Sequence, residues 1–370
     1  GEKWLLGMLC EGEEGQFLLE DLQGQVPLDL THTVTTPGLF TENCVVLAEG
    51  EMGDDGRFRV KMMGFPPPQQ RHESLDAIGT LDLFRTGITP QQWVNVQAME
   101  AQAEDAMFVI ISDLHLDRPI VLEKLRLLFQ GFSQVSPLPL FVLIGDFTSK
   151  PNGMAELLGH FRALADLIAE FPVLAAEGRF VLVPGPKDPG AGNTLPRPPL
   201  ASKFTSYLKE KVPHASFATN PCRIRFYAQE MVIFREDILK KMTRHCIFAP
   251  THSPAQPTAT SAGGSADGGD DDGAPPSSER EMDVTEHLVK TLLDQGHLCP
   301  LPLASRPIHW KYDHALRMYP MPDVVVLADR TDQYSWRYED CLSLNPGSFP
   351  TDFSFVVYRP STFETEFSRV

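Results

Sequence analysis

The chain has 370 residues, of which 42% are hydrophobic, and a formal charge of −17 at neutral pH. This length is enough for two domains with substantial cores. The acidic balance disfavours a broad nucleic-acid-binding surface, because nonspecific affinity for DNA comes mostly from Lys and Arg side chains that neutralise phosphates. Any contact with DNA is therefore expected to be local or indirect.

The six cysteines are scattered and form no C-x-x-C pair. This spacing predicts neither a zinc knuckle nor a disulfide framework, and it favours a reducing intracellular compartment. The sequence contains no apolar run of about 18 residues, so we expect no membrane span. Its start at Gly1 has neither an initiator Met nor the form of a signal peptide, which is typical of a fragment or a processed chain.

Short strands separated by turn signals dominate the N-terminal part, which we assign to a domain over residues 1–90. Five short strands at regular spacing predict a small OB-like β-barrel. The stretch 79–84 is expected to add one more strand, and residues 91–105 form a polar, helical connector. The five predicted strands are 4–10, 16–20, 26–30, 44–49 and 58–65.

From residue 106 to residue 370 the pattern changes to strand, polar turn and helix, which predicts a layered α/β domain. Leu157, Phe161, Leu164 and Ile168 lie on one face of an amphipathic helix. A hairpin over 224–234, a buried strand at 324–327 and a final strand at 353–358 follow.

An acidic, glycine-rich segment interrupts this second domain at residues 251–281. Its composition is too polar to bury a core, so we predict a disordered surface insertion. A calcium loop is the alternative for its acidic run, but the glycine turn and the terminal Glu of such a loop are absent.

Polar residues follow the apolar runs of the second domain. The run 108–111 leads to Asp113 and His115, and the run 141–144 leads to Gly145 and Asp146. Carboxylates and imidazoles at neighbouring strand ends can gather around metal ions, and these match the first two ligand motifs of a binuclear metallophosphoesterase.

The third strand end departs from that enzyme pattern. After the run 180–183, Pro186, Lys187 and Asp188 stand where such an enzyme carries Asn, His and an acidic residue. Proline has no side-chain donor or acceptor, and the lysine adds a positive charge beside the site. His297 is a candidate for a later lone histidine ligand, but residues 328–331 lack the final Gly-His-x-His pair.

Together these features resemble the B subunits of replicative DNA polymerases, an OB-like barrel followed by an inactivated, layered calcineurin-like phosphoesterase β-sandwich with flanking helices. The epsilon branch of this family is the most similar, and the similarity covers nearly the whole chain. It is carried by VPGPKDPG at 183–190, LPRPPL at 195–200, TNPCRI at 219–224, FRED at 234–237, QGHL at 295–298 and LNPGSF at 344–349.

The resemblance implies a non-catalytic accessory subunit without a cofactor, acting as a scaffold in the nuclear DNA replication machinery. Its partner would be the catalytic subunit of DNA polymerase epsilon, bound through that subunit's C-terminal zinc-binding region. The replicative helicase assembly and small histone-fold subunits are further candidate partners, and DNA contacts are mostly indirect. Family members usually carry an additional N-terminal helical domain, which has no counterpart in these 370 residues.

Three interpretations of the strand-end residues stay open. Asp113, His115 and Asp146 can cap loops and helix ends, or they can hold one metal ion weakly. With His297, they can also form an active single-metal phosphodiesterase or exonuclease. A separate alternative is single-stranded DNA binding by the barrel, as OB folds can perform, although few Lys and Arg accompany its aromatic residues.

Overall fold

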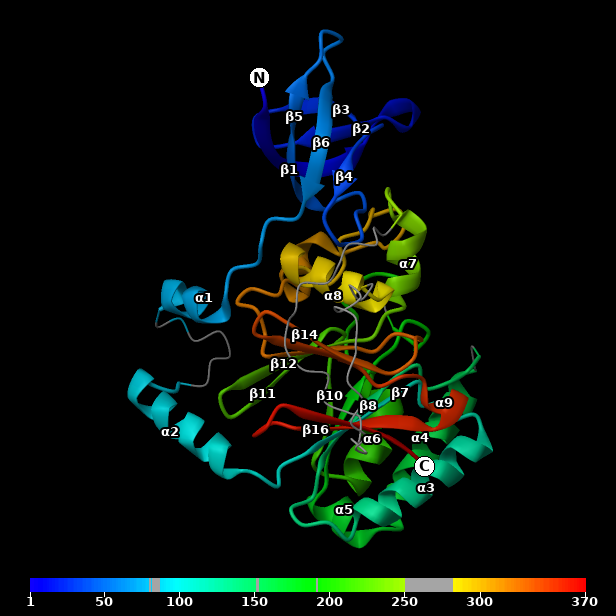
Figure 1. Cartoon of the computed structure of the whole chain (residues 1–370). Helices are drawn as coiled ribbons and strands as arrows, with labels where there is room; N and C mark the ends of the chain where they lie inside the picture. Colours follow the sequence, from blue (N-terminus) through cyan, green and yellow to red (C-terminus); the bar gives the residue numbers. More distant parts are fainter. Residues whose placement is uncertain (80, 82–86, 151–152, 191, 250–281) are drawn as a thin grey trace, which may run out of the picture. The chain divides into compact units, whose positions relative to one another are not determined.

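The computed structural model describes residues 1–79, 81, 87–150, 153–190, 192–249 and 282–370 (Figure 1). The chain divides into two compact units. Unit 1 comprises Gly1–Pro68, Leu239–Pro302 and Arg337–Glu339, and unit 2 comprises Gln69–Ile238, Leu303–Trp336 and Asp340–Val370. The predicted domain limits of 1–90, 91–105 and 106–370 are consecutive stretches of the chain, whereas each compact unit combines separate stretches. These limits remain a prediction.

Unit 1 contains a closed barrel. Its strands are ordered β3-β2-β1-β5-β6-β4, and a further pairing of β3 with β6 closes the sheet on itself. The five predicted strands are all present, and the short β4 was not predicted. The strands are β1 (Lys3–Glu11), β2 (Phe17–Glu20), β3 (Gln25–Asp29), β4 (Val34–Thr35), β5 (Val45–Met52) and β6 (Phe58–Gly64), with a 3-10 turn η1 at Glu13–Gly15.

Alternate residues of these strands point into the barrel, as the two-residue period of a strand requires. Leu9, Val46, Phe58 and Met63 are among the fully buried members of its core. The additional strand predicted at 79–84 falls almost entirely outside the described residues. The predicted acidic insertion at 251–281 lies outside them as well.

A helix from the second half of the chain completes unit 1. α8 (Val284–Gln295) begins with a capping box at Asp283 and ends at Gly296 in the left-handed conformation. The Gly38 amide donates to His287 Nδ1 at 2.9 Å, and the Leu39 amide donates to Thr291 Oγ1 at 2.8 Å. These buried contacts join α8 to the loop before β5. The helix α7 (Ile238–His245) precedes α8 in the chain.

Unit 2 is built around two sheets. The first has the order β10-β9-β8-β7-β16-β17 and the second has the order β11-β12-β13-β15-β14. The first consists of β7 (Phe108–Ser112), β8 (Leu140–Ile144), β9 (Arg179–Val183), β10 (Ala215–Phe217), β16 (Ser354–Arg359) and β17 (Glu364–Arg369). The second consists of β11 (Cys222–Phe226), β12 (Gln229–Phe234), β13 (Val324–Leu327), β14 (Tyr334–Tyr338) and β15 (Cys341–Asn345).

Both faces of the first sheet are buried, which explains why its strands read as continuous apolar runs. Phe108, Ile110 and Val142 share a core with Ile233 and Val326 of the second sheet. The opposite face packs against helices that lie along one side of the sheet in Figure 1. These are α3 (Pro119–Phe132), α4 (Met154–Ala169), α5 (Pro172–Glu177) and α6 (Ser202–Lys211).

The amphipathic helix predicted around residues 157–168 is α4, and the predicted helical connector corresponds to α2 (Pro90–Gln102). The remaining described helices are α1 (Arg71–Ile78), the 3-10 segment η2 (Trp310–Leu316) and α9 (Phe349–Asp352). No helix in the described part of the chain has the length and apolar character needed to cross a lipid bilayer.

The strand predicted at 353–358 is present as β16, shifted by one residue, but the prediction that it is the final strand was wrong. Phe353 has a φ of 58° and ends α9, so the strand begins at Ser354. A further antiparallel strand, β17, then pairs with β16 along the edge of the sheet. β17 has only exposed and half-buried residues, without strict alternation, and contains little apolar sequence, so periodicity did not reveal it.

We predict that Gly50→Ala destabilises the barrel, because the backbones of β5 and β6 approach closely where their register shifts. A Cβ atom at Gly50 would lie 2.0 Å from the Arg59 carbonyl oxygen, whereas one at Gly24 would meet open space. Gly50→Ala should lower the free energy of unfolding by about 2 kcal/mol or more, and Gly24→Ala should change it by less than about 0.5 kcal/mol. Urea denaturation measures both, and equal midpoints would contradict the prediction.

Candidate functional site

The candidate site lies where strands of unit 2 end. Asp113 follows β7, Asp146 follows β8, and Arg235 follows β12. In open α/β sheets, side chains that follow the carboxyl ends of parallel strands gather at one edge, which is the usual place for a site. The Asp146 amide donates to Asp113 Oδ1 at 3.2 Å, so the first two strand ends are joined directly.

The turn after β9 approaches the same point closely. A Cβ atom at Gly185 would lie 2.4 Å from Asp146 Oδ1 and 2.7 Å from the Asp146 amide nitrogen, so only glycine fits there. The Lys187 amide then donates to Asp146 Oδ1 at 2.8 Å. Asp188 turns inward and accepts hydrogen bonds from the amides of Phe147 and Gly185 at 2.8 and 2.7 Å.

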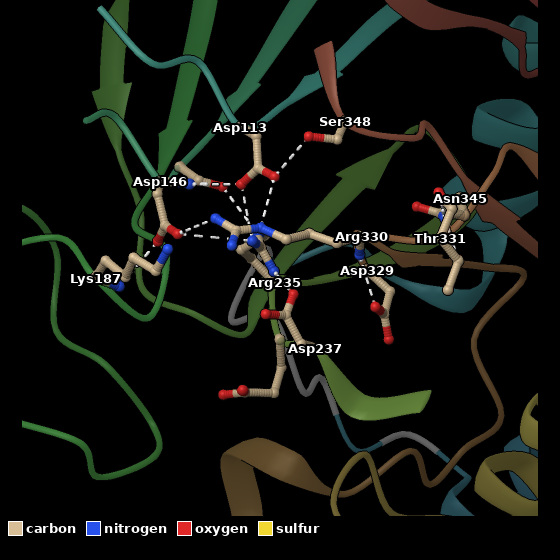
Figure 2. A network of polar contacts seen from close by, with 12 residues as sticks. Asp113, Asp146, Lys187, Arg235, Asp237, Asp329, Arg330, Thr331, Asn345 and Ser348 are labelled. Carbon is tan, nitrogen blue, oxygen red and sulfur yellow. Dashed lines mark hydrogen bonds and ion pairs between the residues drawn. The ribbon is translucent and has the colours of Figure 1, made fainter. Parts of the chain in front are cut away.

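Arg235 is fully buried and forms the centre of the site (Figure 2). Its Nη2 lies 2.8 Å from Asp113 Oδ1 and 3.7 Å from Asp146 Oδ2. Its Nη1 is 2.8 Å from Asp237 Oδ1, and its Nε donates to the Gly145 carbonyl at 2.9 Å. One guanidinium group therefore meets three carboxylates and a backbone carbonyl.

A second arginine closes the site from the β13 side. Arg330 Nε lies 3.0 Å from Asp113 Oδ2, and its Nη2 lies 2.8 Å from Asp146 Oδ2. The Ser348 hydroxyl donates to Asp113 Oδ2 at 2.8 Å. All four carboxylate oxygens of Asp113 and Asp146 thus have partners supplied by the protein, as Figure 2 shows.

Asp113 and Arg235 each stabilise the charged form of the other. Burial alone would raise the pKa of the Asp113 carboxyl, but the guanidinium groups of Arg235 and Arg330 hold it well below its usual range. Burial alone would lower the pKa of Arg235, and the carboxylates of Asp113 and Asp146 raise it instead. Asp113 and Arg235 are therefore an ionised pair inside the protein.

The sequence-predicted residues divide into two groups. Ligand atoms of Asp113, His115 and Asp146 lie within 4.8 Å of one another. Burial lowers the pKa of His115, and both of its ring nitrogens are buried without a hydrogen-bond partner among the described residues. Of these three side chains, only the His115 imidazole has no hydrogen-bond partner among the described residues.

The other predicted residues are Pro186, Lys187 and Asp188, in the turn after β9, and His297. Pro186 is half-buried, and the Lys187 side chain is exposed, so the amide of Lys187 rather than its charge reaches the site. Burial raises the pKa of Asp188 to about 7. His297 belongs to unit 1, where its Nδ1 accepts a hydrogen bond from the Cys299 amide at 3.0 Å.

This arrangement does not fit a pair of divalent metal ions. Metal ligands must offer free lone pairs, and the oxygens of Asp113 and Asp146 already accept hydrogen bonds from guanidinium groups, amides and a hydroxyl. A bound cation would also face two fixed positive charges. Asp146 would have to give up both Arg330 and the Lys187 amide before it could bridge two metals.

Sequence reasoning did not assign a role to Arg235 or Arg330. Each follows a buried strand of the second sheet, in the segments FRED at 234–237 and ADRT at 328–331. Arg235 stands directly after a fully buried strand and Arg330 stands three residues after one, which was an available signal. Their shared partners Asp113 and Asp146 could not be foreseen, because these follow strands of the other sheet.

Comparison with known proteins identifies the class. Residues 108–336 match the family model of the DNA polymerase alpha/epsilon B subunit. Residues 1–67 match that of the DNA polymerase epsilon subunit 2-like OB-fold domain. The chain therefore belongs to the family of DNA polymerase alpha/epsilon B subunits.

Individual relatives agree with this assignment. The chain is 41% identical to DNA polymerase epsilon subunit 2 of Homo sapiens and 40% identical to the DNA polymerase epsilon B subunit of Arabidopsis thaliana. Each alignment covers 100% of this chain and 66% of the relative, so the chain spans just under two thirds of these proteins. A solved archaeal phosphodiesterase shares 12% identity at a TM-score of 0.35, over 71% of this chain and 99% of its own.

We predict that Arg235→Leu destabilises the protein by about 3–5 kcal/mol, because it leaves the buried Asp113 carboxylate without its main partner. Arg126→Leu is the matched control, since Arg126 also binds a carboxylate, that of Glu170, but at the surface. This second substitution should change the free energy of unfolding little.

The loss of stability caused by Arg235→Leu should depend on pH. Pairing with Arg235 holds the pKa of Asp113 low, so its stabilisation is present above the ordinary Asp pKa of about 3.9 and lost below it. In Arg235→Leu, the Asp113 carboxylate keeps only Arg330 as a charged partner, so it takes up a proton more readily on acidification, and the deficit should shrink between neutral and acidic pH. Equal effects of the two substitutions at pH 7, or a deficit that grows in acid, would contradict this.

Proposed function

We propose that this chain is a non-catalytic accessory subunit of a DNA polymerase epsilon assembly and acts there as a scaffold in the nucleus. One observation carries the non-catalytic part: Arg235 and Arg330 bind the same carboxylates that a metallophosphoesterase would use for its metals. We also infer that unit 2 is a modified calcineurin-like phosphoesterase sandwich. Asp113 and Asp146, placed within two residues of the ends of neighbouring strands, support this origin.

The partner we propose is the C-terminal zinc-binding region of the polymerase's catalytic subunit. Membership of the B-subunit family supports this partner. A scaffold needs a rigid surface rather than a reactive centre, and the network around Arg235 fixes several loops at one edge of the sheets. The helicase assembly and the histone-fold subunits stay further predictions of the family resemblance.

The rival proposal is a single-metal phosphodiesterase at Asp113, His115 and Asp146. The free ring nitrogens of His115 favour it. Against it, the metal would have to displace Arg330 from both carboxylates and would remain beside the buried charge of Arg235. Single-stranded DNA binding by the barrel is disfavoured by charge, since residues 1–67 hold 12 Asp and Glu against 4 Lys and Arg.

Two readouts on the purified chain test the proposal. We expect a stable complex with the C-terminal region of the epsilon catalytic subunit in size-exclusion chromatography, and none with the matching region of a different replicative polymerase. We also expect no turnover of phosphodiester or single-stranded DNA substrates with Mn²⁺. Failure of the complex would contradict the scaffold, and turnover that Asp146→Asn abolishes would establish the rival enzyme.

A further inference from the structure

One face of the barrel in unit 1 carries a continuous row of exposed apolar side chains. Trp4, Leu6 and Met8 alternate outward along β1, with exposed fractions of 57%, 57% and 36%. Between them, Leu5 is half-buried and Gly7 is buried, and Leu9, which follows Met8, is buried in the barrel. The outward face of this strand is therefore apolar over its central residues, where a solvated strand normally places polar side chains.

The neighbouring strands extend this row into a patch. Val45 of β5 lies opposite Met8 on β1, and it is exposed. On the other side of β5, Met62 of β6 pairs with Glu49, and Val34 of β4 pairs with Met62. We call this patch the β1 face, and its members are Trp4, Leu6, Met8, Val34, Val45 and Met62, all of them exposed.

Scattered exposed apolar residues are normal, but six of them gathered on four paired strands mark an interaction surface. Trp and Met suit such a role. Trp buries a large area on contact, and the flexible Met side chain adapts to the shape of a partner. The β1 face thus has the composition of a docking surface.

Two carboxylates lie beside or within the β1 face. Glu20 of β2 lies opposite Met8, and Glu49 lies between Trp4 and Met62. In the described chain, neither glutamate is held in an ion pair. β6 carries two exposed cations, Arg59, which lies opposite Glu51, and Lys61, which is engaged by Glu2 at 2.8 Å and by Glu51 at 3.9 Å.

We propose that the β1 face binds a basic amphipathic helix of a partner protein. Charge selects this occupant, because apolar side chains with one carboxylate beside them and one between them complement apolar side chains flanked by Lys or Arg. Size agrees, since Trp4 to Met8 spans about 13 Å of strand, the length of about nine helical residues. A nucleic acid would bring phosphates against carboxylates.

This proposal does not rest on the inactive centre. The β1 face belongs to unit 1, whereas Asp113, Asp146 and both arginines belong to unit 2. Loss of one function by substitution should therefore leave the other in place.

The test uses the whole chain and labelled probes in fluorescence anisotropy. The probes are a helical Leu/Lys peptide of about 18 residues, a Leu/Glu peptide with the same apolar pattern, and an oligothymidylate of about 20 nucleotides. We expect the Leu/Lys peptide alone to bind, and to bind more weakly as salt rises.

Substitutions then locate the binding surface. The triple change Trp4→Ser, Leu6→Ser and Met62→Ser should weaken binding of the Leu/Lys peptide by about tenfold or more. Leu127→Ser is the matched control, because Leu127 is an exposed apolar residue of unit 2 with an exposed fraction of 54%. It should leave the affinity unchanged.

A charge-reversal pair keeps the test decisive if the triple variant fails to fold. Glu20→Lys with Glu49→Lys should weaken binding several-fold, and Glu177→Lys, an exposed glutamate of unit 2, should not. The proposal is overturned if the Leu/Lys peptide does not bind or if both sets of barrel variants bind it normally. Equal binding of the Leu/Glu peptide, or binding of the oligothymidylate that the triple variant loses, would also overturn it.

Discussion

The buried ion pair between Asp113 and Arg235 constrains the ends of several strands at the same time. Asp113 follows β7 and Arg235 follows β12, so the pair connects the two sheets of unit 2. Asp146, Arg330 and Ser348 bring the ends of β8, β13 and β15 to the same point. A carboxylate this deeply buried is costly without a cation, and each loop must therefore keep its place for the others to remain paired.

In this unit, arginines provide the positive charge that metal ions would provide in a metallophosphoesterase. Guanidinium groups differ from bound metals in two ways that matter here. They are charged at every accessible pH and are attached to the chain, so the site does not depend on a supply of ions. They also occupy oxygens of both carboxylates and cannot activate a water molecule as a metal does. Arginines in place of metal ions thus account both for a rigid edge of the sheets and for the proposed loss of phosphoesterase activity.

Much of this architecture could be predicted from short-range patterns, because strand and helix periods are local properties of the sequence. The OB-fold barrel, the α/β character of the second part, and the positions of Asp113 and Asp146 after their strands all follow from such patterns. Arg235 and Arg330 could not be assigned in this way, since they meet Asp113 across 122 and 217 residues of chain. The attachment of α8 to the barrel through His287 was missed for the same reason, as 249 residues separate it from Gly38.

The measurement that tests the central claim most directly is calorimetric titration of the purified chain with Mn²⁺, compared with the Arg330→Ala variant. If the arginines take the place of the metals, the unmodified chain should show no stoichiometric binding. Arg330→Ala, which frees oxygens of both Asp113 and Asp146 beside His115, should bind more strongly than the unmodified chain. Binding of one Mn²⁺ per unmodified chain at micromolar concentration, unchanged by Arg330→Ala and lost in Asp146→Asn, would contradict the account.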